Sequence, residues 1–106
     1  MTVESKGTIK LNNENYEIWR ILIEAVFTRR NVRDVALGVT AMPTSGPNSK
    51  AVKDWNRQSA EARAEMILSV EVDQLAHMTA ITAYEVWQEL ELFIVLYGIK
   101  TRRSLP

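Results

Sequence analysis

Three tryptophans, each inside its own stretch of helical periodicity, restrict most strongly how this chain can fold. Around Trp19, Trp55 and Trp87, apolar residues recur every three or four positions, the spacing that places side chains on one face of a helix. A buried tryptophan removes a large apolar surface from water and ties its helix to its neighbours. The pattern therefore predicts three substantial helices around one core, with a tryptophan as the anchor of each.

Residues that favour helix ends mark the limits of these helices. We expect the first helix over about 14–30. The helix over about 50–71 follows Ser49, whose hydroxyl can accept a hydrogen bond from a free helix N–H. The last helix is expected to begin at the capping box Thr82–Glu85 and to end at Gly98. Candidate caps of the first helix are Asn12, Asn13 and Asn15.

Two shorter helical turns complete the pattern. Asn31 is the expected cap of a short helix that Gly38 ends in a left-handed conformation. Residues 72–78 form the other turn, with Leu75 and Met78 pointing inward. No alternating strand pattern of useful length occurs, so the prediction is an all-α fold, a compact orthogonal bundle of about five helices.

The length of 106 residues fits a single domain. Residues 1–10 are polar for most of their length and are expected to be a flexible N-terminal segment. Residues 11–98 form the predicted helical domain, and residues 99–106 a basic C-terminal tail.

Charge and cysteine content exclude several classes of protein. Thirteen basic residues balance thirteen acidic ones, so no overall field would draw the domain onto nucleic acid or an anionic membrane. The absence of cysteine excludes disulfides and thiolate metal sites, and it fits a cytoplasmic location. The most apolar stretch, 90–97, is shorter than the roughly 20 residues of a membrane span. We therefore expect no membrane partner.

Catalysis requires groups of matched pKa within reach of a substrate, and the sequence offers few of them. His77 is the single histidine and stands four positions after Asp73, which would supply two metal ligands without a third. Ser59, which interrupts the apolar face of its helix, does not stand in a nucleophile motif with Glu61 and His77. We predict no enzyme activity, no metal site, no cofactor and no small-molecule substrate.

A basic cluster is the remaining candidate for nucleic-acid binding. Its residues are Arg29, Arg30 and Arg33, at the junction of the first two predicted helices. Contacts from such side chains to phosphates would be sensitive to salt and blind to sequence. A neutral domain without a known recognition motif is a poor RNA binder, so RNA remains a weak alternative partner.

Four short motifs resemble, in order and spacing, those of Ty1/copia-type retrotransposon Gag proteins. Residues Leu11–Trp19 resemble the family's opening Leu-x-Gly-x-Asn-Tyr-x-x-Trp, with Asn13 in place of the glycine. Residues Val32–Gly38 and Pro43 are similar to its short second helix and the turn that follows. Residues Thr82–Leu90 resemble its Thr-Ala-x-Glu-x-Trp-x-x-Leu signature. The remaining motif comprises Trp55, Ala62, Ile67 and Ser69.

The resemblance implies the N-terminal lobe of a retroviral-type capsid, a helical domain that self-associates into a shell around the element's RNA without catalysing a reaction. It spans about Ile9–Leu96 and includes neither the capsid's C-terminal lobe nor a Cys/His zinc knuckle. The expected partners are copies of the same chain or a Gag-like protein. The residues that the family motifs assign to the core are Leu11, Tyr16, Trp19, Trp55, Trp87 and Leu90.

The last helix offers a candidate interface, because it is apolar nearly all round and such a helix needs burial on more than one side. The candidate residues are Phe93, Ile94, Leu96 and Tyr97. A second expected surface is the N-terminal half of the first helix, together with the basic cluster. Two alternatives stay open: a truncated Gag-like protein that interferes with a Gag lattice or binds another protein, and an RNA-binding module.

Overall fold

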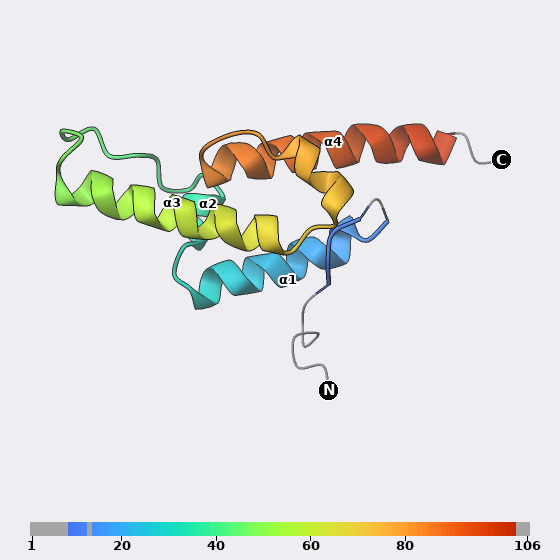
Figure 1. Ribbon diagram of the computed structural model, residues 1–106, viewed down its shortest axis with the longest axis horizontal. Coiled ribbons are helices and arrows are strands. Elements are labelled where there is room, and N and C mark those ends of the chain that lie inside the picture. The colour runs from blue at the N-terminus through green and yellow to red at the C-terminus, as the bar shows by residue number, and fades with distance from the viewer. Residues whose placement is uncertain (1–8, 13, 104–106) are drawn as a thin grey trace.

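Helices build the described part of the chain (Figure 1). The computed structural model describes residues 9–12 and 14–103, and at position 77 and over 94–103 it describes the backbone alone. Within these ranges there is no strand, only an isolated parallel bridge between Leu11 and Val70. The elements are α1 (Tyr16–Arg29), α2 (Arg33–Ala36), α3 (Lys50–Leu68), the 3-10 helix η2 (Val72–His77) and α4 (Ala83–Arg103). The all-α prediction is confirmed, while a capsid-like arrangement stays a prediction.

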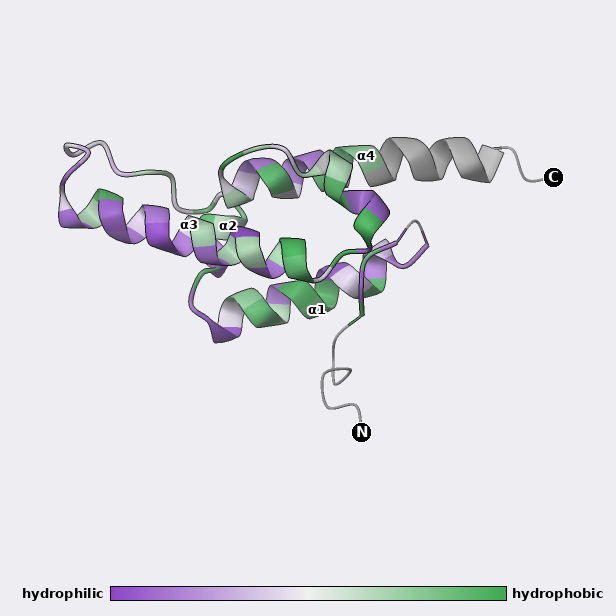
Figure 2. Cartoon of the chain, in the orientation of Figure 1, coloured by the Kyte–Doolittle hydropathy of each residue, from purple (hydrophilic) through white to green (hydrophobic). Residues whose placement is uncertain are grey.

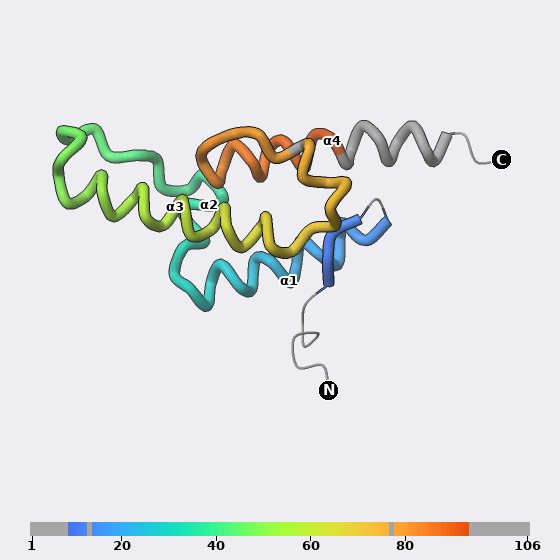
Figure 3. The backbone as a smooth tube through the Cα atoms, viewed as in Figure 1, coloured from blue at the N-terminus to red at the C-terminus, as the bar shows by residue number. Residues whose placement is uncertain are grey.

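Helices α1 and α3 lie side by side with the chain running in opposite directions, and α4 also packs against α3 (Figure 1). The extended residues before α1 lie beside the C-terminal end of α3 (Figure 3). There the Leu11 N–H donates to the Ser69 carbonyl at 2.9 Å, and the Glu71 N–H donates to the Leu11 carbonyl at 2.9 Å. This bridge anchors the start of the domain to the end of α3.

No helix in the described ranges is long and apolar enough to cross a membrane.

An aromatic cluster between α1 and α4 forms the centre of the core. Trp19 and Trp87 stack with their ring centroids 6.2 Å apart, and Phe27 approaches Trp87 at 5.9 Å. Such pairs add about 0.5–1.5 kcal/mol beyond their buried area. Along α3, hydrophilic residues predominate in the N-terminal half and hydrophobic residues nearer the C-terminus (Figure 2).

Trp55 differs from the expectation that all three tryptophans share one core. It is buried but lies outside the cluster that contains Trp19 and Trp87. Its indole N–H donates to the Thr40 carbonyl at 2.9 Å. The Trp55 bond therefore ties the loop between α2 and α3 to α3.

The junction between α1 and α2 corrects the predicted role of Asn31. Asn31 has a φ of 62° and ends α1, while Val32 occupies the N-cap position of α2. The Val32 N–H donates to the Phe27 carbonyl at 2.9 Å and the Asn31 N–H to the Thr28 carbonyl at 3.1 Å. These two bonds form a Schellman motif, which needs a left-handed residue that asparagine tolerates. Gly38 has a φ of 81° after α2, as predicted.

The start of α1 also differs from the predicted capping. Asn15 is its N-cap residue but makes no side-chain bond to the helix. The Asn15 amide instead accepts a bond from the Asn12 N–H at 2.9 Å and donates to the Lys10 carbonyl at 2.9 Å. The side chain therefore stabilises the turn that leads into α1, an outcome open to asparagine because it both donates and accepts.

Helix α3 ends at Leu68, three residues before the predicted end. The backbone leaves the helix there because the carbonyl of Ser69 accepts bonds from the Leu11 N–H and from the Trp19 indole N–H. Ser49 caps the other end as predicted, since its hydroxyl accepts from the Val52 N–H at 3.2 Å.

The inward residues of η2 were predicted in part. Met78 is buried, but Leu75 is 40% exposed and Gln74 is buried in its place. The prediction assumed α-helical periodicity, whereas a 3-10 helix has about three residues per turn and turns the side chains by a different angle.

Helix α4 begins as predicted and runs further than predicted. The Thr82 hydroxyl accepts from the Glu85 N–H at 3.3 Å, which is one half of the predicted capping box. The helix continues through Gly98 to Arg103, because a glycine inside a helix costs only about 1 kcal/mol relative to alanine. Residues 99–103 thus belong to α4 and not to a tail, and residues 104–106 lie outside the described part. The predicted flexibility of residues 1–10 stays a prediction.

Candidate functional site

Helix α1 carries an apolar stripe that the core does not cover. We define the α1 stripe as Ile18, Ile21, Leu22 and Ala25, spaced so that they share one side of the helix. Ile18 is 56% exposed and Ile21 is 66% exposed, while Leu22 is half-buried. A helix needs one apolar face for its own domain, and α1 has a second.

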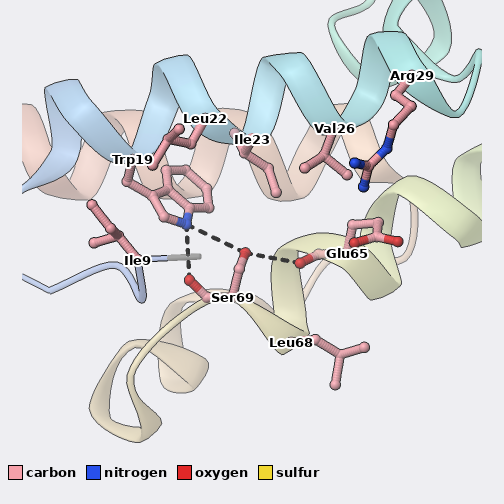
Figure 4. A pocket seen from close by; sticks show the side chains of 9 residues that line it. All are labelled: Ile9, Trp19, Leu22, Ile23, Val26, Arg29, Glu65, Leu68 and Ser69. Carbon is pink, nitrogen blue, oxygen red and sulfur yellow. Dashed lines mark hydrogen bonds between the residues drawn. The ribbon is translucent and has the colours of Figure 1, made fainter. Parts of the chain in front are cut away.

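A groove runs along this stripe between α1 and the C-terminal end of α3 (Figure 4). Trp19 and Ile23 are buried beneath it, Leu22 and Val26 line it from α1, and Leu68 lines it from α3. Its volume of about 180 Å³ is smaller than the roughly 300–1,000 Å³ of typical small-molecule sites. The groove has room for a few side chains of a docking surface.

The two ends of the groove differ in polarity (Figure 4). Ile9 lies at the end near Trp19, and Arg29 and Glu65 lie at the other. One hydrogen bond joins the two sides of the groove, because the Trp19 indole N–H donates to the Ser69 carbonyl at 2.8 Å. The Ser69 hydroxyl donates in turn to the Glu65 carbonyl at 2.8 Å. Both sides of the groove are therefore tied to each other by hydrogen bonds.

The predicted basic cluster does not form one positive surface. Arg30 contacts Glu65 at 2.6 Å and Glu61 at 3.1 Å, both on α3. Arg33 contacts Asp34 at 3.4 Å and lines a separate polar hollow at the end of α1. Only Arg29 belongs to the groove and has no ion pair within the described residues. The structure thus separates three arginines that the sequence places together.

The family-motif residues of α1 and α4 converge in the core. Leu11, Trp19, Trp87 and Leu90 are buried together, with Tyr16 packed against them. The Tyr16 hydroxyl is buried without a hydrogen-bond partner in the described ranges. Burial, followed by the charge of Glu91, raises the pKa of Tyr16 to about 12. These residues stabilise the fold, and Trp19 also forms part of the groove.

The predicted interface on α4 lies mostly beyond what the structure describes. Phe93 is half-buried. The side chains of Ile94, Leu96 and Tyr97 lie outside the described residues, so this interface stays a prediction.

A second apolar surface surrounds Gly38. A Cβ atom at Gly38 would lie 2.6 Å from the ring of Tyr84, so glycine lets this ring pack on the α2 end. Val39 and Ile81 beside these residues are 67% and 84% exposed. Neither the α1 groove nor the polar hollow beside Arg33 includes these residues.

No side-chain cluster typical of metal binding occurs in the described part of the chain. No group of three or more His, Asp or Glu side chains there could hold a metal ion. The His77 side chain lies outside that part, so its pairing with Asp73 stays untested. Ser59 is buried and its hydroxyl accepts from the Ala83 N–H at 2.9 Å, which is a structural role.

Sequence reasoning missed two contributors to the groove, Leu68 and Glu65. Leu68 lies inside the predicted helix over about 50–71, and nothing in the sequence places Glu65 near the first helix. A usable signal existed for α1, whose apolar residues cover more of the helix than one face requires. No comparable signal marks Leu68, because the groove depends on where α3 ends.

A comparison of the chain with protein-family models, curated proteins and solved structures finds no match.

Proposed function

We propose that this chain is a non-catalytic self-association module of the capsid type that its resemblance to copia-type Gag proteins implies. The observation that carries the proposal is the exposed α1 stripe beside an apolar groove. Contiguous apolar surface of this kind is typical of protein–protein interfaces. A second copy of the chain presents the same stripe and can therefore cover the exposed stripe of the first.

The size of this surface predicts weak and reversible association. Full burial of an isoleucine or leucine side chain contributes about 1.5–3 kcal/mol. Association costs about 4–15 kcal/mol in lost translational and rotational freedom. The free energy gained by burying a few such side chains exceeds this cost only modestly. One contact alone therefore gives weak dimers.

The RNA-binding alternative has less support. Arg30 and Arg33 already contact carboxylates, which leaves Arg29 as the free cation of the predicted cluster within the described residues. Each phosphate contact by a cation contributes separately to affinity, so one free arginine favours little binding.

The test is the mass of the protein in solution as its concentration rises. We expect light scattering after size exclusion to give the 12.1 kDa monomer at low concentration and larger species at higher concentration. The Ile21→Asp variant should shift this transition to higher concentration, because burial of a carboxylate in an apolar interface is unfavourable.

The matched control is Ile81→Asp, which makes the same change at an exposed isoleucine outside the α1 stripe. It should leave the association unchanged. A 12.1 kDa monomer at every concentration up to millimolar would overturn the proposal. If Ile94→Asp with Leu96→Asp abolished association while Ile21→Asp did not, α4 and not α1 would form the interface.

A further inference from the structure

The charges on α1 and just before it are separated toward the two ends of the α1 stripe. Glu14 and Glu17 lie at its N-terminal end and Arg29 lies at its C-terminal end. Between them, Arg20 and Glu24 pair with each other at 3.6 Å. Within the described ranges the side chains of Glu14, Glu17 and Arg29 form no ion pair. The stripe is thus apolar in the middle, with an unpaired acidic end and an unpaired basic end.

The acidic and the basic residues lie at opposite ends of the stripe, so reversing the direction of the helix exchanges their positions. A rise of 1.5 Å per residue places Glu17 and Arg29 about 18 Å apart along the helix. When a second α1 runs antiparallel beside the first, its acidic end meets the basic end of the first helix. The same contact recurs at the other end, because a two-fold interface uses each contact twice.

We propose that two copies of this chain pack through their α1 stripes in antiparallel orientation, an inference that rests on the proposed function. The two-fold axis passes near Ile21 and Leu22, so Ile21 of one copy opposes Leu22 of the other. Ile18 then opposes Ala25, and Arg29 lies beside Glu14 and Glu17 of the second copy. The helix dipoles also oppose each other in this orientation, which is favourable.

The charges exclude the parallel alternative on physical grounds. Parallel stripes would place Glu17 beside Glu17 and Arg29 beside Arg29 of the second copy. Like charges at an interface are unfavourable, and charges at its rim set orientation more than they set affinity. Arg29 is exposed and lines the end of the groove beside the stripe, where a second copy can reach it.

The experiment uses two variants with opposite charge changes, Arg29→Glu and the double variant Glu14→Lys with Glu17→Lys. Each alone places like charges at both ends of the antiparallel pair. We expect each to weaken self-association about tenfold at low salt, measured by sedimentation velocity. An equimolar mixture should restore association, because an all-acidic stripe then faces an all-basic one. The combined triple variant should also associate like the unchanged protein.

The matched control is Lys53→Glu, which alters the net charge as Arg29→Glu does but lies on α3 outside the stripe and the groove. It should change association by less than about twofold. If the protein associates but Arg29→Glu and Lys53→Glu act alike, the antiparallel packing is wrong and the self-association function stands. If the unchanged protein stays monomeric throughout, both the function and this packing are overturned.

Discussion

The two sides of α1 carry similar apolar side chains in different surroundings. On the inner side, Trp19, Ile23 and Phe27 are almost fully buried against α3 and α4. On the outer side, Ile18 and Ile21 are more than half exposed. Since residue type is nearly the same, the difference comes from which side the rest of the domain covers. One helix can therefore stabilise a fold with one side and offer an interaction surface with the other.

The largest expected effect is a difference in stability between substitutions on the inner and the outer side of α1. Trp19→Ala removes a buried indole that stacks on Trp87 and bonds the Ser69 carbonyl, and should cost about 3–5 kcal/mol. Ile21→Ala on the outer side should change stability by less than about 0.5 kcal/mol. Urea denaturation followed by tryptophan fluorescence measures both. Similar losses would show that the α1 stripe belongs to the core.

A smaller effect tests whether a buried polar contact contributes more to stability than an exposed one. Ser59→Ala leaves the buried Ala83 N–H without its acceptor, which should cost about 1–3 kcal/mol. Thr82→Ala removes the more exposed cap of the same helix and should cost about 1 kcal/mol. Thermal unfolding of the two variants shows which substitution lowers the stability more. If Thr82→Ala cost more, the Ser59 contact would contribute little to the start of α4.

The smallest expected effect concerns Tyr16, whose hydroxyl is buried beside the core without a partner in the described ranges. Tyr16→Phe removes a desolvated group and should raise stability at neutral pH by up to about 1 kcal/mol. Burial and the nearby charge of Glu91 raise the pKa of Tyr16 from 10.0 to about 12. The folded state therefore holds this proton more tightly than the unfolded state does.

The pH dependence follows from that difference in pKa. The stabilisation from the raised pKa of Tyr16 is present below pH 10 and is lost as pH rises toward about 12. Unfolding free energies of the unchanged protein and of Tyr16→Phe, compared from pH 9 upward, should show a steeper decline for the protein that keeps Tyr16. Parallel declines would mean that the hydroxyl is hydrated in solution.

Features that depend on neighbouring residues in the sequence were predictable. The Ser49 and Thr82 caps and the left-handed Gly38 each follow from one residue and its local spacing. The paired burial of Trp19 and Trp87 follows from helical periodicity. The N-terminal half of the first helix was an expected assembly surface, but this expectation came from the resemblance and not from periodicity.

Features that depend on contacts between distant segments were not predictable. Helix α3 ends at Leu68 and not at the predicted residue 71, because the Ser69 carbonyl accepts bonds from the distant Leu11 N–H and Trp19 indole N–H. Ser59 was expected to interrupt an apolar face, yet it bonds the start of α4 from 24 residues away. In each case the residue could serve either role locally, and the contact across the fold selected one.

The sequence by itself determined the helical class, the main helix positions and the residues available for the core, because these follow from local propensity and periodicity. Only the tertiary structure decided which side of α1 is buried, where α3 ends, and that Arg29 stays free while Arg30 pairs with Glu61 and Glu65. The physical reason is that burial and ion pairing depend on groups brought together from distant parts of the chain. The α1 stripe and its groove arise from that packing.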